Sequence, residues 1–221
     1  MAFEDRDGGI YFTILGGKFA IKLDPKLWEN KSDAELLEAR VVKRINKAGK
    51  TVYERYHNSF TGKLIGIKTQ DSTAYGKNWL FSFQDGGEVY NLTLSYSNSF
   101  ATAFLKTLPN IDLSKEMKVQ PSVKEVDGKD KSSLFVSQDG VTLKHAYTRE
   151  NPNGMPDMEQ ITVKGILQWD DTKRINWLHD MVVRDIIPKL PKRQEVAQKS
   201  SGLSVDNEES VDDMAKDIAD I

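Results

Sequence analysis

The chain of 221 residues contains no cysteine, which excludes disulfide bonds, thiolate metal sites and a cysteine nucleophile. No apolar run approaches the roughly 18 residues that a membrane-spanning helix requires. The acidic start MAFEDRDGG lacks the apolar stretch of a secretion signal. We therefore expect a cytoplasmic protein without a membrane segment, in line with the missing cysteines.

Recognisable enzyme motifs are also missing. None of the five Gly-Lys pairs has the earlier glycine of a phosphate-binding loop, and only one of them is followed by Ser or Thr. Helix capping already explains the adjacent pair Asp170-Asp171. We predict no catalytic residue, no metal site and no cofactor, although a nuclease with scattered carboxylates and Mg²⁺ stays open as an alternative. The sequence has three histidines, His57, His145 and His179. They lie far apart in the sequence, and none belongs to an HExxH-like helix.

Short stretches rich in β-branched and aromatic residues alternate with Gly- and Asp-containing turns along most of the chain. The turn Asp85-Gly86-Gly87 marks the clearest hairpin, and Ile161–Trp169 reads as a final strand. Helices are predicted around Phe100–Leu108 and along Ile175–Ile186. A parallel α/β sheet would need a helix after nearly every strand. The pattern therefore favours a mainly β barrel or sandwich with two or three helices.

The charge of the chain is divided unevenly along its length. The last sixteen residues, Asp206–Ile221, hold seven carboxylates and one lysine, a net charge of −6. Of the chain's 31 cations and 33 anions, 30 and 26 then remain on residues 1–205, a net charge of +4. We predict a folded body over residues 1–190, a basic and polar linker over 191–205 and a disordered acidic tail over 206–221.

A basic body and an acidic tail suit a protein that binds a polyanion, because the tail can compete for the same surface or recruit partners. The alternative is a tail that only keeps an ordinary domain soluble. Four apolar tail residues are spaced by 3, 4 and 3 positions, as on one side of a helix that folds onto a partner groove. The predicted partner-binding residues are Asp206, Glu208, Glu209, Val211, Asp212, Asp213, Met214, Asp217, Ile218, Asp220 and Ile221.

Cations and aromatic residues are interleaved between Arg40 and Tyr90, a mixture that suits single-stranded nucleic acid. Cations follow the phosphates, and aromatic rings stack on bases without reading their sequence. The predicted nucleic-acid-binding residues are Lys43, Arg44, Lys47, Lys50, Tyr53, Arg55, Tyr56, Lys63, Lys68, Tyr75, Lys77 and Trp79.

Strand alternation separates these aromatics into core and surface candidates. Phe81 and Phe83 are predicted to be core residues. Trp79 stays open between core and ligand, because it lies at the start of its strand. Tyr53 shares a strand face with Arg55 and a histidine, which is too polar for a core, so it is the better stacking candidate.

Three segments resemble phage-encoded single-stranded-DNA-binding proteins with an OB-fold body and an acidic C-terminal tail. They are YERYHNSFTGKLIGIKTQ (Tyr53–Gln70), LFSFQDGGEVYNLTLSYSNSFATAFLKTLPNIDLSK (Leu80–Lys115) and GILQWDDTKRINWLHDMVVRDIIPKL (Gly165–Leu190). The resemblance implies a five-stranded barrel with extra strands, DNA across its basic-aromatic face and a tail that docks onto replication proteins. Tails of this class often end in Phe, whereas this chain ends in Ala219-Asp220-Ile221.

The sequence thus predicts a non-enzymatic protein that binds single-stranded DNA without sequence specificity in phage DNA replication and recombination. It would act in the host cytoplasm, and its tail would compete with DNA and recruit a polymerase, helicase or nuclease. The alternative is a structural virion or scaffold component with the same β-rich body.

Overall fold

The computed structural model describes residues 9–46, 48–72, 76–126 and 128–191. Strands make up 48% of it and helices 23%, so the prediction of a mainly β protein is confirmed. None of the described helices is long and apolar enough to cross a membrane.

Ten strands form one large sheet in the order β10-β9-β8-β5-β6-β7-β1-β2-β4-β3. Neighbours are antiparallel except β1 and β7, which run parallel. The predicted hairpin at Asp85–Glu88 joins β6 to β7. The strand bounds are β1 Ile10–Leu15, β2 Lys18–Leu23, β3 Val42–Ile45, β4 Thr51–His57, β5 Phe60–Ser72, β6 Gly76–Asp85, β7 Glu88–Ser95, β8 Met117–Val126, β9 Lys129–Gln138 and β10 Val141–Thr142.

The large sheet curls but does not close, whereas the resemblance implied a closed five-stranded barrel. β5 bends the sheet, because its first residues pair with β8 and the rest pair with β6 around a bulge at Leu64–Gly66. The turn between β1 and β2 then meets β8. A Cβ atom added at Gly17 would lie 2.8 Å from the backbone nitrogen of Val123. The turn comes close to β8, but β2 forms no ladder of hydrogen bonds with it, so the sheet stays open between β2 and β8.

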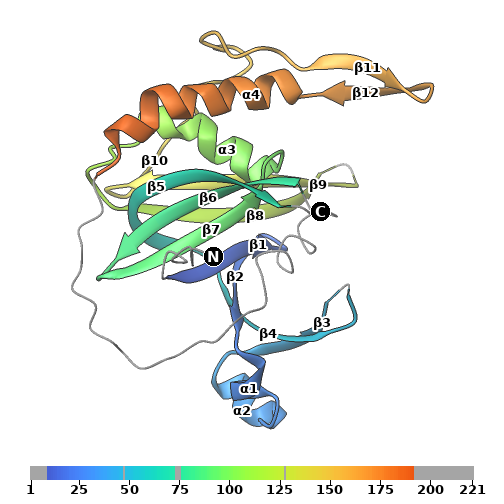
Figure 1. Ribbon diagram of the computed structural model, residues 1–221, viewed down its shortest axis with the longest axis vertical. Coiled ribbons are helices and arrows are strands. Elements are labelled where there is room, and N and C mark those ends of the chain that lie inside the picture. The colour runs from blue at the N-terminus through green and yellow to red at the C-terminus, as the bar shows by residue number, and fades with distance from the viewer. Residues whose placement is uncertain (1–8, 47, 73–75, 127, 192–221) are drawn as a thin grey trace, which may run out of the picture.

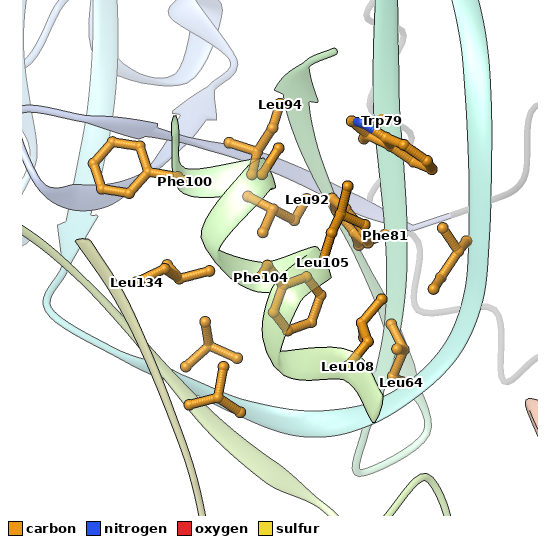
Figure 2. Packing of buried hydrophobic residues seen from close by; sticks show 14 of the residues in the cluster. Leu64, Trp79, Phe81, Leu92, Leu94, Phe100, Phe104, Leu105, Leu108 and Leu134 are labelled. Carbon is orange, nitrogen blue, oxygen red and sulfur yellow. The ribbon is translucent and has the colours of Figure 1, made fainter. Parts of the chain in front are cut away.

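Helix α3 (Ser99–Thr107) fills the inside of the curl and carries the main core (Figure 1). Its Phe104 ring packs edge-on against Phe81, with 5.0 Å between ring centroids. Figure 2 shows Phe104, Leu105 and Leu108 facing the inner side of the sheet at Leu64 and Phe81. The prediction that Phe81 and Phe83 are core residues is confirmed, since both are fully buried.

Helix α4 (Thr172–Met181) lies beside α3 and continues as a π-type turn, η2 (Val182–Ile186), then as the 3₁₀ turn η3 (Ile187–Lys189) (Figure 1). The predicted helix along Ile175–Ile186 is therefore present. The apolar residues Ile175, Leu178 and Ile186 are buried along one side of it. The 3₁₀ turn η1 (Leu108–Asn110) ends α3 at Pro109.

A small second cluster forms where β3 and β4 extend beyond the main body. Helices α1 (Pro25–Trp28) and α2 (Asp33–Glu38) cover Tyr53 of β4, with Leu36 and Val41 buried beside it. A full capping box opens α2: the Glu35 amide donates to the Ser32 hydroxyl, and the Glu35 side chain accepts from the Ser32 amide.

The segment Ile161–Trp169 is a hairpin and not the single strand that the sequence predicted. Strand β11 (Glu159–Val163) turns at Lys164-Gly165 into β12 (Ile166–Asp170). Both turn residues have positive φ, 51° and 80°, as a two-residue hairpin turn requires. This hairpin projects from the start of α4, away from the large sheet (Figure 1).

Candidate nucleic-acid interface

The curl gives the large sheet an inner face against α3 and an outer face on its far side. On β8 and β9 the inner face carries Val119 and Val136, both buried. Cross-strand register puts the alternate residues of the two strands on the outer face. We call this set the lysine face: Lys118, Gln120, Ser122 and Lys124 of β8 with Lys129, Lys131, Ser133, Phe135 and Ser137 of β9.

The lysine face carries cations without neighbouring carboxylates. Lys124 stands directly opposite Lys131 across the ladder, an arrangement of like charges that destabilises an antiparallel pair. The acidic residues of β8 and β9 are Glu125 and Asp130. They stand opposite each other in the ladder, on the other face of the two strands. A polyanion laid on the lysine face would remove this repulsion.

Phe135 is the exposed aromatic residue of the lysine face. Its side chain is 46% exposed, although Leu134 and Val136 on either side are buried. It stands opposite Gln120, two positions along β8 from Lys118. An exposed aromatic ring among lysines provides the two contacts that a single strand uses, a surface for base stacking and charge for phosphates.

The outer face continues from β8 onto β5, where Thr61 stands opposite Lys118. Lys63 and Lys68 lie on this side of β5, opposite Gln84 and Leu80 of β6. The structure thus places two predicted residues, Lys63 and Lys68, on the same side of the sheet as the lysine face.

The outer side of β6 and β7 is polar and buried. The Ser82 hydroxyl donates to Asn91 Oδ1 at 2.7 Å, and the Thr13 hydroxyl of β1 donates to the Thr93 carbonyl at 3.0 Å. Three buried polar atoms, Asn78 Oδ1, Asn91 Nδ2 and Thr93 Oγ1, have no hydrogen-bond partner among the described residues. Such atoms are uncommon in native structures, but Asn78, Asn91 and Thr93 are at most 1% exposed, so they offer no contact to a ligand on this side.

Arg44 and Tyr56 form a polar cluster with buried Glu54 on the same side of β3 and β4. Arg44 donates two hydrogen bonds of 2.7 Å to the Glu54 carboxylate, and the Tyr56 hydroxyl donates a third of 2.6 Å. Burial, and then the hydrogen bond to Glu54, raise the pKa of Tyr56 to about 12. This network fixes β3 against β4, so Arg44 and Tyr56 have a structural role at this end of the sheet.

Two of the aromatic residues predicted to bind nucleic acid are buried: Tyr53, the better stacking candidate, and Trp79, which stayed open between core and ligand. Both predicted contacts with nucleic acid are therefore wrong. Tyr53 is 3% exposed, because α1 and α2 cover the strand face that seemed too polar for a core. Trp79 is 1% exposed and stacks on Tyr96, with 5.3 Å between ring centroids. A ring with so little exposed surface offers no face to a base.

The other predicted cations are scattered. Lys43 and Lys50 are exposed beside the small cluster, at the end of the sheet away from the lysine face. The Lys77 ammonium lies 4.5 Å from the centre of the Tyr96 ring. Arg55 points to the inner side, where its Nε is buried without a described hydrogen-bond partner.

Some predicted residues lie outside the described parts of the chain. These are Lys47, Tyr75 and the whole acidic tail Asp206–Ile221. Their predicted roles remain predictions.

The basic and aromatic stretch predicted from the sequence ends at Tyr90, so the lysine face lies outside it. The signal was present further on, in the alternation of lysine, valine and polar residues over 117–126 and in the sequence Ser133-Leu-Phe-Val-Ser137. Strand alternation alone places the side chain of Phe135 on the opposite face of the sheet from those of Leu134 and Val136. It does not show which of the two faces the rest of the fold covers.

The described residues hold no group of three or more His, Asp or Glu side chains placed to bind a metal ion. The Nδ1 atom of His145 lies 3.1 Å from the Thr107 hydroxyl. Burial lowers the pKa of His145, with Lys106 nearby as the second cause. Thr107 itself donates to the Ala103 carbonyl, so helix bonding accounts for its hydroxyl.

Comparisons with protein-family models, curated proteins and solved structures found no match.

Proposed function

We propose that this protein binds single-stranded DNA without sequence specificity, on the outer face of the large sheet. The observation that supports this best is the lysine face, where four lysines share a surface with the exposed ring of Phe135. Among the described residues of β8 and β9, no carboxylate lies on this face. The lysines would contact phosphates, and Phe135 would stack on a base. Neither contact distinguishes one base from another.

The path of the strand would run from the lysine face over Thr61 and Lys63 of β5. The net charge of +4 on residues 1–205 favours a polyanionic ligand.

The acidic tail adds two functions to this proposal. In the absence of DNA it would occupy the basic surface, and with DNA bound it would be released to recruit replication and recombination proteins. This is the role of a non-enzymatic coat protein for exposed single strands, in the host cytoplasm if the chain is viral.

A direct test is fluorescence anisotropy of a labelled oligo(dT) of about 30 nucleotides, against a duplex of equal length, over a series of salt concentrations. We expect preference for the single strand and a steep loss of affinity with salt. Phe135→Ala should weaken binding about tenfold, because one stacked base contributes ~1–3 kcal/mol. Lys124→Ala with Lys131→Ala should lower the slope of log K against log salt by about 0.7 for each phosphate that is no longer neutralised.

The matched control is Lys26→Ala, which removes an exposed lysine on α1, far from the lysine face. Its affinity and salt slope should equal those of the wild type. Lack of binding to oligo(dT) at low salt would refute the proposal and favour the structural alternative. Equal losses in Lys26→Ala and the lysine-face variants would refute the location of the site.

A further inference from the structure

The β11–β12 hairpin, which we call the hairpin arm (Glu159–Asp170), has almost no packing of its own. Nine of its ten strand residues are exposed, and it pairs with no other described strand. An ion pair between Glu159 and Lys173, at 2.6 Å, links it to α4. A two-stranded hairpin is at best marginally stable in water, so the arm needs a surface to pack against.

Both faces of the hairpin arm carry exposed apolar side chains among polar ones. Cross-strand register puts Ile161, Val163 and Ile166 on one face. Leu167 and Trp169 lie on the other, 62% and 63% exposed. An exposed apolar surface of this kind on a small β element marks a place where another protein binds.

A second set of exposed apolar residues lies at the opposite end of the molecule (Figure 1). Leu27 of α1, Leu37 of α2, and Val42 and Ile45 of β3 are 46–79% exposed. We call this set the apolar pole. β3 is also the last strand of the large sheet, so its outer edge presents backbone N–H and C=O groups for a further strand.

Both the hairpin arm and the apolar pole carry several exposed apolar side chains. Six of them, counting Met158 beside the arm, lie on the arm side and four on the pole, each 38–79% exposed. A standard protein interface buries roughly 800 Å² per partner, about 60% of it apolar, so it needs a set of this kind on each side.

The two regions also carry opposite charge. Residues 157–171 around the arm hold four carboxylates and one lysine, whereas residues 25–50, which include α1, α2 and β3, hold seven cations and four carboxylates. Ion pairs with residues outside these two ranges reduce the size of the net charge of each region. Glu54 pairs with Arg44 beside the pole, and Lys173 pairs with Glu159 of the arm. With Lys173, Arg174 and Glu54 included, the net charge is −1 around the arm and +2 around the pole, so the two signs stay opposite.

We propose that the hairpin arm of one copy docks on the apolar pole of the next copy of this chain. A contact between two hairpin arms would bring equal acidic charges together and would leave the apolar pole uncovered. A contact between different surfaces joins copies head to tail, so it produces open chains or closed rings of copies. The interface requires no DNA, and it therefore stands or falls independently of the proposed function.

The test measures the mass of the full chain by sedimentation over a wide concentration range without DNA. We expect the wild type to grow beyond a dimer as concentration rises. The arm variant Leu167→Ser/Trp169→Ser and the pole variant Leu37→Ser/Ile45→Ser should each associate at least about thirtyfold more weakly, the loss typical of interface residues that carry most of the binding energy. The matched control Val141→Ser/Val183→Ser alters exposed apolar residues elsewhere and should assemble as the wild type does.

Mixing the two variants distinguishes head-to-tail docking from other modes. The arm variant keeps an intact pole and the pole variant keeps an intact arm, so an equimolar mixture should form a dimer and grow no further. A wild type that stays monomeric at every concentration would overturn the proposal. So would a mixture without dimers, or a control that assembles as weakly as the variants. Circular dichroism of each variant verifies that the fold is kept.

Discussion

The inner and outer faces of the large sheet are built by the same strands and have opposite roles. On the inner face Phe81 and Phe83 are completely buried against α3 (Figure 2). On the outer face of β9, Phe135 is nearly half exposed between lysines. The same type of side chain therefore stabilises the fold on one face and is available to a ligand on the other. The face a residue occupies, more than its type, decides what it does.

The strongest way to test this comparison is to remove one phenylalanine from each face. Phe81→Ala should lower the free energy of unfolding by about 3–5 kcal/mol, because it leaves a cavity beside Phe104. Phe135→Ala should change it by less than about 0.5 kcal/mol, as surface substitutions do. Urea unfolding of both variants measures the difference, and similar losses for the two would contradict the assignment of faces.

A buried ion pair on the outer side sharpens the comparison, because there a polar residue has a structural role. Glu54→Ala should destabilise the protein by about 2–3 kcal/mol, since it leaves Arg44 and Tyr56 without the acceptor that they share. The exposed pair between Lys115 and Asp139 is the control, and Lys115→Ala should cost less than about 0.5 kcal/mol. Thermal unfolding at neutral pH compares them, and equal losses would mean that Glu54 is not buried as the structure has it.

The smallest expected effect concerns alkaline pH and Tyr56. Its pKa in the folded state is raised from 10.0 to about 12, first by burial and then by the hydrogen bond to Glu54. The unfolded chain loses this proton first, so the stabilisation is complete below pH 10 and is lost as the pH rises towards 12. The melting temperature of the wild type should fall more steeply over this range than that of Tyr56→Phe. Parallel curves there would contradict the raised pKa, whereas between pH 7 and 9 parallel curves are expected.

Local patterns in the sequence predicted several elements correctly. The hairpin turn at Asp85–Glu88 and the helix that ends at Pro109 depend on contacts within a few residues. Phe81 and Phe83 could be assigned to the core because alternation separates them from the polar residues of the same strand.

Prediction was wrong where a distant segment covers a strand. Tyr53 shares its face with Arg55 and His57, yet α1 and α2 bury it, and nothing in the strand itself indicates that they do. The hairpin arm was read as one strand because Lys164-Gly165 is surrounded by β-forming residues on both sides.

The sequence by itself determined the mainly β character of this protein, most of its turns and the alternation along each strand, since these follow from local sterics and hydrogen bonding. It also determined the basic character of residues 1–205 and the acidic character of the tail. Only the tertiary structure decided which face of each strand lies inside the curl, that the lysines of β8 and β9 share one surface with Phe135, and that the hairpin arm and the apolar pole stand at opposite ends. Those features depend on how strands far apart in the chain pair and bend, and that is a property of the whole sheet.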